Sequence, residues 1–289
     1  MRASGIKTKG GIAAEIIYPS VGMELCNIPD IDFKQACMEA YNRWLAEFCA
    51  PYPHRLIGLG QCAVKTPASS IKELEAIKAH GFKGVLLPGF PGTEEDYNHE
   101  MFTEFFAAMV ELELVPSFHI LTAGDALTRG FRGSKINSFM SIVRSNQDLM
   151  SMFVFDSLFM RHPKLKIVSA EADGGWAPHY MYRMDHAYDR HRHWMRGREL
   201  DKRPSEYFRE HIYFTFQDDY TAFRFKDDMN IERMMWANDF PHSDSTWPWS
   251  QEILAKHAGH LTVHEKNRVL HSNVAELYRL DTSALKAVA

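Results

Sequence analysis

Short apolar segments alternate with longer segments of helical periodicity along nearly the whole chain. This alternation constrains the fold because parallel strands need a long crossover connection, which is usually a helix. It therefore indicates a parallel sheet wrapped by helices. The expected strands are Ala13–Tyr18, Leu56–Val64, Gly84–Pro88, Val115–Leu121, Lys166–Glu171, Ile212–Gln217 and Arg233–Asp239. The expected helices are Asp32–Phe48, Pro67–His80, Met101–Leu112, Lys135–Arg161, Pro178–Trp194, Trp247–His257 and Val263–Arg279.

The number of expected strands bears on which α/β fold the chain adopts. Seven strands, each followed by a helix, are one fewer than the eight that close a TIM-type (β/α)8 barrel. An open doubly wound sheet is the alternative, but no glycine-rich phosphate fingerprint follows the first expected strand. Residues 1–11 are polar and glycine-rich, and we expect them to be irregular. We predict a single domain over 1–289, an incomplete barrel whose first strand is missing, and we hypothesise that the chain begins downstream of its natural start.

The net charge and the cysteine content restrict which binding partners and which cellular compartment are expected. The formal net charge is -4 and the pI is about 6.4, which argues against nucleic-acid or anionic-membrane partners because both require clustered Lys and Arg. The four cysteines form no C-x-x-C pair, and the sequence shows no secretory signal peptide. No apolar run approaches the roughly 20 residues that cross a bilayer. We expect a cytoplasmic protein with reduced thiols.

Three expected strands end in residue types that bind metal ions. The strand near 115 ends at His119, the strand near 167 ends at Glu171, and the strand near 234 ends at Asp239, with His242 shortly after. Active sites of (β/α) barrels lie at the carboxyl ends of the strands, so these groups are expected to meet. One imidazole and two carboxylates suit Zn²⁺ or a similar divalent ion.

Each of these residues also has a purely structural interpretation. His119 could be a hydrogen-bonded core histidine. Glu171 could cap the following turn or pair with Arg183, and Asp239 could cap the helix near Trp247. Their coincidence at three strand ends favours the metal site over three independent structural roles.

Further residues are candidates for substrate binding. Arg129 and Arg132 lie in a glycine-containing loop after the His119 strand, where either could bind a substrate carboxylate, although a solvated loop is the alternative. Trp176 and Trp247 follow the Glu171 and Asp239 strands, and Trp247 could wall the pocket or staple the next helix. The histidines of 179–194 are expected on an exposed or subunit-facing helix rather than in a second metal site.

Several local signatures occur together in this chain. They are GIAAEIIYPS at 11–20, PSFH at 116–119, RHP at 161–163, EADGGW at 171–176, NDFPH at 238–242 and DSTWP at 244–248. In this combination the chain resembles the amidohydrolase-related family, in the branch that includes aminocarboxymuconate-semialdehyde decarboxylase and resorcylate decarboxylase. The resemblance covers nearly all of residues 11–280.

The resemblance implies roles for particular residues. It makes His119 a metal ligand on the fifth barrel strand, and Asp239 on the eighth strand a metal ligand that can handle protons. It places His242 in the substrate pocket. The family's first strand carries a His-x-His or Glu-x-His pair that this chain lacks, and the well-studied decarboxylases have a histidine near the position of Glu171. The resemblance also implies a homodimer or larger homo-oligomer.

The residues and the resemblance together predict an enzyme. We expect a metal-dependent hydrolase or non-oxidative decarboxylase acting on a small carbonyl or carboxylate compound, with Asp239, His242 and Glu171 as catalytic residues. Zn²⁺ is the expected ion and Mn²⁺ the alternative. Catalytic zinc normally has three protein ligands, and His119 and Asp239 supply two. The alternative is therefore an impaired or truncated barrel with a structural or assembly role.

Overall fold

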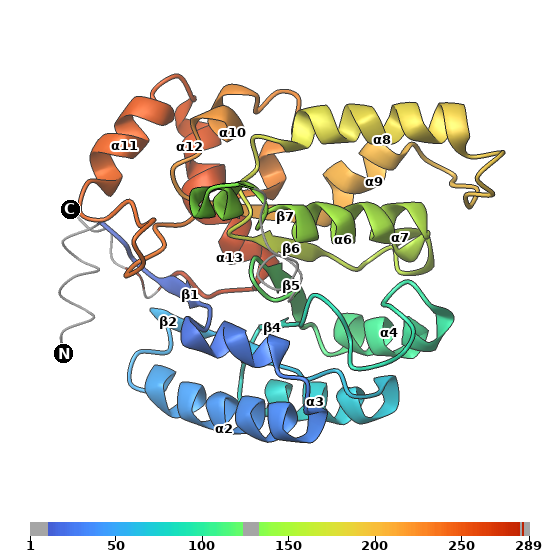
Figure 1. Ribbon diagram of the computed structural model, residues 1–289. Coiled ribbons are helices and arrows are strands. Elements are labelled where there is room, and N and C mark those ends of the chain that lie inside the picture. Colours follow the sequence, from blue (N-terminus) through green and yellow to red (C-terminus); the bar gives the residue numbers. More distant parts are fainter. Residues whose placement is uncertain (1–10, 124–132, 284, 286–289) are drawn as a thin grey trace.

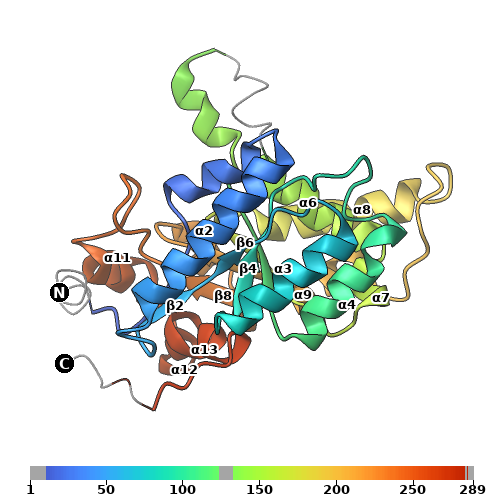
Figure 2. The same cartoon turned by 90° about the horizontal axis from the view of Figure 1, so that it is seen from below.

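The strands of the protein all run parallel and lie at its centre, with helices around them (Figures 1 and 2). The protein is described by a computed structural model covering residues 11–123, 133–283 and 285. Two strands form one sheet in the order β1–β2, and six form a second in the order β3–β4–β5–β6–β7–β8. This confirms the predicted parallel α/β architecture. The strands are β1 (Glu15–Ile17), β2 (Leu56–Gly58), β3 (Gly60–Gln61), β4 (Gly84–Leu86), β5 (Val115–His119), β6 (Ile167–Ala170), β7 (Ile212–Phe216) and β8 (Met234–Trp236).

The segment expected as one strand over Leu56–Val64 is two strands that serve different sheets. β2 pairs with β1, in the register Ile17 to Gly58, whereas β3 pairs with β4. The intervening Leu59 still donates its backbone N–H to the carbonyl of Ile17, at 3.3 Å. The chain therefore passes from the two-stranded sheet to the six-stranded sheet at a single residue, Leu59. In the described residues no ladder joins β1 to β8, so the ring of strands is open between them.

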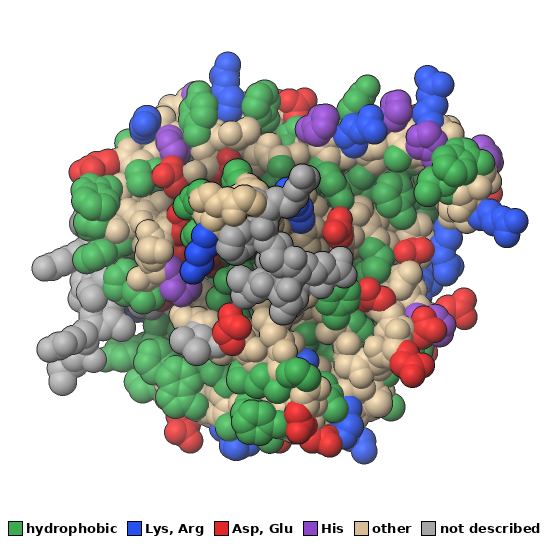
Figure 3. Space-filling model, viewed as in Figure 1, with side chains coloured by type: hydrophobic (Ala, Val, Ile, Leu, Met, Phe, Trp, Pro, Cys, Tyr) green, Lys and Arg blue, Asp and Glu red, His purple; other side chains and the backbone are tan. Residues whose placement is uncertain are grey.

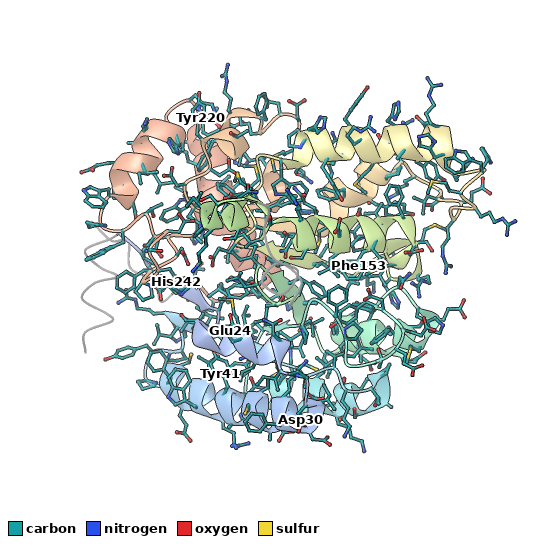
Figure 4. The ribbon with its side chains drawn as sticks, viewed as in Figure 1. Glu24, Asp30, Tyr41, Phe153, Tyr220 and His242 are labelled. Atoms are coloured by element: carbon teal, nitrogen blue, oxygen red, sulfur yellow. The ribbon has the colours of Figure 1, made fainter. Side chains whose placement is uncertain are left out.

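Alternate side chains of the strands point to opposite sides of the sheet. One set meets inside the ring, where Leu59, Val168 and Met235 pack together with Tyr278 from the end of the last helix. A Cβ on Gly84 would come within 3.0 Å of the Tyr278 ring, so only glycine fits beneath it. The other set packs against the helices in a larger cluster that includes Phe153, which is labelled in Figure 4.

Local sequence signals fix the starts of the early helices. The side chain of Asp30 accepts the backbone N–H groups of Asp32 and Phe33 at the start of α2. A capping box of Thr66 and Ser69 starts α3. No helix within the described ranges is long and apolar enough to span a bilayer. The longer helices are α2 (Ile31–Cys49), α3 (Pro67–Ala79), α4 (Thr103–Glu111), α6 (Arg144–Phe155), α8 (Ala177–His191), α9 (Pro204–His211) and α11 (Ser250–His257).

Shorter helices differ most from the expected elements. The helix expected over 135–161 is interrupted, and Ser157 adopts a left-handed φ of 60° between two of its pieces. The helix expected over 263–279 contains a π-helical turn. The helices α9 and α10 were not predicted. The short helices are η1 (Val21–Asn27), η2 (Glu100–Phe102), η3 (Lys135–Met140), α7 (Leu158–Arg161), α10 (Tyr220–Arg224), η4 (Ile231–Arg233), α12 (Val263–Asn267), η5 (Arg268–Ser272) and α13 (Asn273–Leu277).

Candidate metal centre

Three strand ends bring the expected metal-binding residues to one edge of the sheet. His119 is the last residue of β5, Glu171 directly follows β6, and Asp239 follows β8 by three residues. Glu171 and Asp239 adopt left-handed φ angles of 53° and 55°, which turn the chain sharply at the end of each strand. Such conformations are unfavourable for non-glycine residues and concentrate at functional sites. The hydroxyl of Thr215 on β7 accepts the backbone N–H of Glu171 at 2.8 Å and holds this turn.

His119 and Glu171 are in direct contact. His119 Nδ1 lies 3.0 Å from the carbonyl oxygen of Ile120, which can only accept, so Nδ1 carries a proton. His119 Nε2 lies 3.0 Å from Glu171 Oε2. The His119 side chain is 3% exposed, so water does not weaken this interaction. The two lone-pair groups can approach so closely only if a proton or a cation lies between them.

A second pair of site residues lies beside the first. His242 Nδ1 is 2.7 Å from Asp239 Oδ1, and His242 Nε2 is 3.0 Å from the hydroxyl of Ser20. Figure 4 shows His242 close to β1, the strand that precedes Ser20. The other carboxylate oxygen, Asp239 Oδ2, is buried and has no hydrogen-bond partner among the described residues. A buried acceptor of this kind is costly unless it binds something.

The carboxyl groups of the site have different pKa values. Burial and the nearby charge of Glu171 raise the pKa of Asp239 to about 6, although His242 opposes this shift. Burial is the largest influence on the pKa of Glu171 and tends to raise it. The hydrogen bond and charge of His119, with contributions from His242 and Asp239, together outweigh burial and hold that pKa below its ordinary value. Burial and the neighbouring Asp219 raise the pKa of Asp173 to about 6. The raised pKa values of Asp239 and Asp173 mean that a negative charge on either carboxyl group is unfavourable.

The donor atoms fit a divalent cation. One ligand atom each from Glu171, Asp239 and His242 lie within 4.8 Å of one another. His119 is outside this group of three but contacts its Glu171 member. The acceptor Asp239 Oδ2 and the crowded carboxylates both provide negative charge for a cation to neutralise. Carboxylate oxygen and imidazole nitrogen are common ligands of Zn²⁺, and carboxylates also suit Mn²⁺.

A cavity of about 540 Å³ opens beside these donors. It runs between β1 and β8, the two strands whose facing edges are not paired in the described structure. The size is typical of a pocket for a small organic molecule. Its walls combine apolar side chains with the polar groups of the site. They include Ile12, Ile16, Tyr18, Ser20, Met23, His119, Glu171, Thr215, Gln217, Met235, Trp236, Asp239, Phe240, His242, Leu270 and Tyr278.

Not every residue expected to bind substrate lies at this cavity. Trp176 is outside its walls, because the indole packs edge-on against Phe208 and Phe214 and donates its N–H to the carbonyl of Ala172. The expectation that Trp176 binds substrate stays a prediction. Trp247 is also outside the walls, but its ring meets Phe240, which lines the cavity, at 5.3 Å.

Two expected substrate-binding residues cannot be placed, and three residues that line the cavity were not among the candidates. The two arginines expected to bind a carboxylate, Arg129 and Arg132, lie outside the described residues. Ser20, Tyr18 and Gln217 line the cavity but were not singled out from the sequence. Each lies at or beyond the end of an expected strand, so the strand-end rule that selected His119 would have found them too.

Parallel strands wrapped by helices, with imidazole and carboxylate groups at the carboxyl ends of the strands, define an α/β barrel-type protein whose candidate active site lies at those ends. A family model described as Amidohydrolase matches residues 28–280, and the chain belongs to that family. The match confirms the family predicted from the sequence. A search among curated proteins found no match.

Several solved structures share the fold. The 5-carboxyvanillate decarboxylase of Sphingomonas paucimobilis matches with a TM-score of 0.84 and 21% identity, over 97% of this chain and 83% of that chain. The 2,6-dihydroxybenzoate decarboxylase from Rhizobium matches with a TM-score of 0.77 and 18% identity, over 96% and 88%. A 5-carboxyvanillate decarboxylase of Novosphingobium aromaticivorans, complexed with manganese and 4-hydroxy-3-methoxy-5-nitrobenzoic acid, matches with a TM-score of 0.78 and 22% identity, over 97% and 80%. At these identities the likeness shows a common fold.

Proposed function

We propose that this protein is a metal-dependent, non-oxidative decarboxylase of small aromatic carboxylates. The observation that carries the proposal is the cluster of His119, Glu171, Asp239 and His242 at the edge of one cavity. Three structures with the same fold are decarboxylases of hydroxylated or methoxylated benzoates by their descriptions. The cavity volume of about 540 Å³ suits a substrate with a single ring.

Glu171 and Asp239 would hold the metal ion, with His119 Nε2, which lies 3.0 Å from Glu171 Oε2, as the third ligand. His242, the remaining member of the donor group, would lie beside them as a proton carrier. Manganese is present in three structures of the same fold, and the nitrogen and oxygen donors here suit either Zn²⁺ or Mn²⁺. When bound, such an ion supplies positive charge that stabilises negative charge developing on substrate oxygens. Its charge would also offset the repulsion between the Glu171 and Asp239 carboxylates.

The remaining chemistry belongs to the side chains. Decarboxylation breaks the bond between the ring carbon and the carboxylate, releases CO₂ and leaves an electron pair that must take up a proton. His242 and Asp239 share a 2.7 Å hydrogen bond, so one proton can be held between them and delivered to that carbon. Apolar walls such as Met235 and Leu270 exclude water from the ring.

The proposal is tested by supplying the purified protein with Mn²⁺ or Zn²⁺ and a panel of hydroxylated benzoates. We expect metal-dependent CO₂ release and loss of the ultraviolet absorbance of the acid. An Asp239→Asn variant, which keeps the size of the side chain, should be inactive. Hydrolysis of amides or lactones without CO₂ release would instead indicate a hydrolase, the other chemistry expected from the sequence.

A metal-loaded, folded protein that turns over neither substrate class would overturn the enzymatic proposal. It would favour the alternative of an impaired barrel with a structural or assembly role. Metal binding itself, measured by calorimetry, separates the two cases further, because a purely structural barrel has no need for a stoichiometric ion at His119, Glu171 and Asp239.

We also propose that the protein is a homo-oligomer and acts in the cytoplasm. An aromatic stripe of Tyr41, Trp44 and Phe48 runs along α2, and Trp44 is 54% exposed. Figure 3 shows hydrophobic side chains gathered over this part of the surface. An exposed aromatic face of this kind can pack against the same face of a second copy, as in the isologous interface of a two-fold dimer. The four cysteines are free thiols, which supports a reducing compartment.

A further inference from the structure

Gln217 places a neutral amide group in the same cavity as the candidate metal donors. It directly follows β7, which lies between β6 and β8, the strands that lead to Glu171 and Asp239. Side chains along β7 alternate, since Tyr213 packs inside the ring of strands and Phe214 packs against the helices. The same alternation directs Gln217 into the ring, where it lines the cavity and is only 5% exposed.

Two hydrogen bonds hold Gln217 in place. Its backbone carbonyl accepts the indole N–H of Trp236 on β8, at 3.1 Å. Its side-chain nitrogen Nε2 donates to Asp244 Oδ2, also at 3.1 Å. A glutamine amide has donors only on its nitrogen, so the contact with Asp244 determines which end of the amide is left for a ligand. No hydrogen bond among the described residues uses the other end, the amide oxygen Oε1.

The amide oxygen of Gln217 is therefore an acceptor for a ligand that occupies the cavity. A ligand that fills the cavity excludes water from this oxygen, so the ligand itself must supply the donor. An O–H or N–H group on an aromatic ring can do so, whereas a methoxyl group can only accept. A site that is built to bond a polar group of its ligand discriminates against the analogue that lacks the group.

We propose that Gln217 is a specificity-determining residue whose Oε1 accepts a hydrogen bond from an O–H or N–H group on the ring of the ligand, and that Asp244 is the positioning residue that orients this amide. The inference rests on the proposed decarboxylase function for the reaction that the bound ring undergoes. It adds that a ring with a donor binds more tightly than its methoxylated analogue, by about three- to tenfold in Kd, the range expected for one neutral hydrogen bond.

The test measures ligand binding and does not require turnover. Protein supplied with Zn²⁺ is titrated with 1,3-dihydroxybenzene, 1,3-diaminobenzene and 1,3-dimethoxybenzene, and each Kd is obtained from NMR chemical-shift changes. These ligands lack a carboxyl group, so none can be decarboxylated. We expect the wild type to bind the dihydroxy and diamino ligands about three- to tenfold more tightly than the dimethoxy ligand. The diamino ligand separates a preference for a donor from binding of a phenol oxygen to the metal ion.

Two variants examine the amide and its partner separately. Gln217→Met keeps the length of the side chain but removes the acceptor, so the ratio of the dimethoxy Kd to the dihydroxy Kd should fall about three- to tenfold. Asp244→Asn should lower the ratio as well, because an asparagine can donate to Gln217 Oε1 and let the amide invert. Gln35→Met on α2, where the amide bonds Glu39, is the control and should leave the ratio unchanged.

Each ratio is taken within one protein, so a general loss of stability in a variant does not change it. If Gln217→Met does not fold, Asp244→Asn decides the outcome, because it keeps the size of the side chain. The proposal is overturned if the wild type binds the three ligands equally or not at all, or if the ratio is the same in the wild type and in the folded variant.

Failure of the proposed function has a different signature. A wild-type protein that shows the donor preference but releases no CO₂ from any benzoate refutes the decarboxylase function and leaves the role of Gln217 supported. A protein that releases CO₂ but whose ratio does not respond to Gln217→Met or Asp244→Asn overturns the role of Gln217 and leaves the function supported.

Discussion

At the scale of single residues, the carboxylate of Asp239 combines three unusual properties. Its backbone is left-handed, its Oδ2 atom is buried without a partner in the described structure, and its pKa is raised to about 6. Each property costs stability on its own. Their coincidence at one residue is explained if the carboxylate binds a cation whose charge offsets these costs.

Asp239→Asn is therefore expected to weaken divalent metal binding by at least about 100-fold, since even residues behind metal ligands contribute 10- to 100-fold. Titration of Mn²⁺ by isothermal calorimetry measures the change. Asp173→Asn is the matched control, because Asp173 has a similarly raised pKa but is not in the donor group. Equal loss of affinity in both variants would show that only the total charge matters.

His211 gives a pH dependence unrelated to the metal centre. Its ring is buried against Phe159 and bonds the carbonyl of Leu165, and burial lowers its pKa to about 4 from 6.5. The unfolded chain therefore binds a proton below about pH 6.5 that the folded protein resists until about pH 4. Because the unfolded state binds more protons in this window, stability falls as pH drops from about 6.5 to about 4.

His211→Gln is expected to remove this pH-dependent loss. The difference between pH 7 and pH 4 in the free energy of unfolding should shrink by about 1–2 kcal/mol, allowing for residual solvent screening. Urea denaturation across this range measures it. His264→Gln changes an exposed histidine and serves as the control. A pH profile that is the same in wild type and His211→Gln would contradict the assignment.

Local pattern was enough to find the strand-end donors but not their partners. His119, Glu171 and Asp239 were predicted because each ends an apolar segment whose direction is known in a parallel sheet. The strand-end rule also reaches Ser20, but its contact with His242, 222 residues away, is not encoded by any local pattern. The direction of the Trp176 ring could not be predicted, because a tryptophan near a strand end can turn either to the cavity or to the helices.

At the scale of elements, α2 carries an aromatic face that the rest of the described residues leaves exposed. Trp44 stacks on Phe48 at 5.3 Å. Phe33, which lies on the same face of α2 about three turns before Trp44, is 58% exposed. Trp44→Glu is expected to convert the proposed oligomer to a monomer, because a charge in a packed apolar interface is desolvated without a partner. Light scattering after size exclusion measures the mass. Tyr182→Glu, which alters an exposed aromatic residue on α8, should leave the mass unchanged.

Element boundaries were predicted less well than element types. The strand expected over 56–64 was found, but its division at Leu59 depends on pairing with β1 on one side and β4 on the other, which no local pattern encodes. The helix α9 was missed because its eight residues lie between a charged surface segment and β7. Its position instead depends on tertiary contacts, since Ser205 is held by Asp185 of α8.

At the scale of the whole molecule, metal binding is expected to contribute to stability. A ligand that binds only the folded state stabilises it by about 2.7 kcal/mol at 100 times its Kd. For a chain of this size that corresponds to a rise in Tm of several degrees. Chelator treatment should remove the rise, and re-addition of Mn²⁺ or Zn²⁺ should restore it. Differential scanning fluorimetry measures it, and Asp239→Asn should show no response to either treatment.

The overall architecture followed from the alternation of strands and helices. Parallel strands, the helical layer and the family were predicted correctly because each depends on repeated local signals. The expected single domain over 1–289 stays a prediction. Whether β1 pairs with β8 could not be predicted from the sequence, because strand pairing depends on which strand edges meet in space.

The division of the strands into two sheets has a mechanical consequence. The candidate metal donors Glu171 and Asp239 follow strands of the six-stranded sheet, whereas Ser20 follows a strand of the two-stranded sheet. Any sliding of one sheet past the other changes the Ser20–His242 separation before it disturbs the metal donors. The Ser20–His242 distance therefore reports how firmly the two sheets are held together. The rate of hydrogen exchange at β1 should change with that distance.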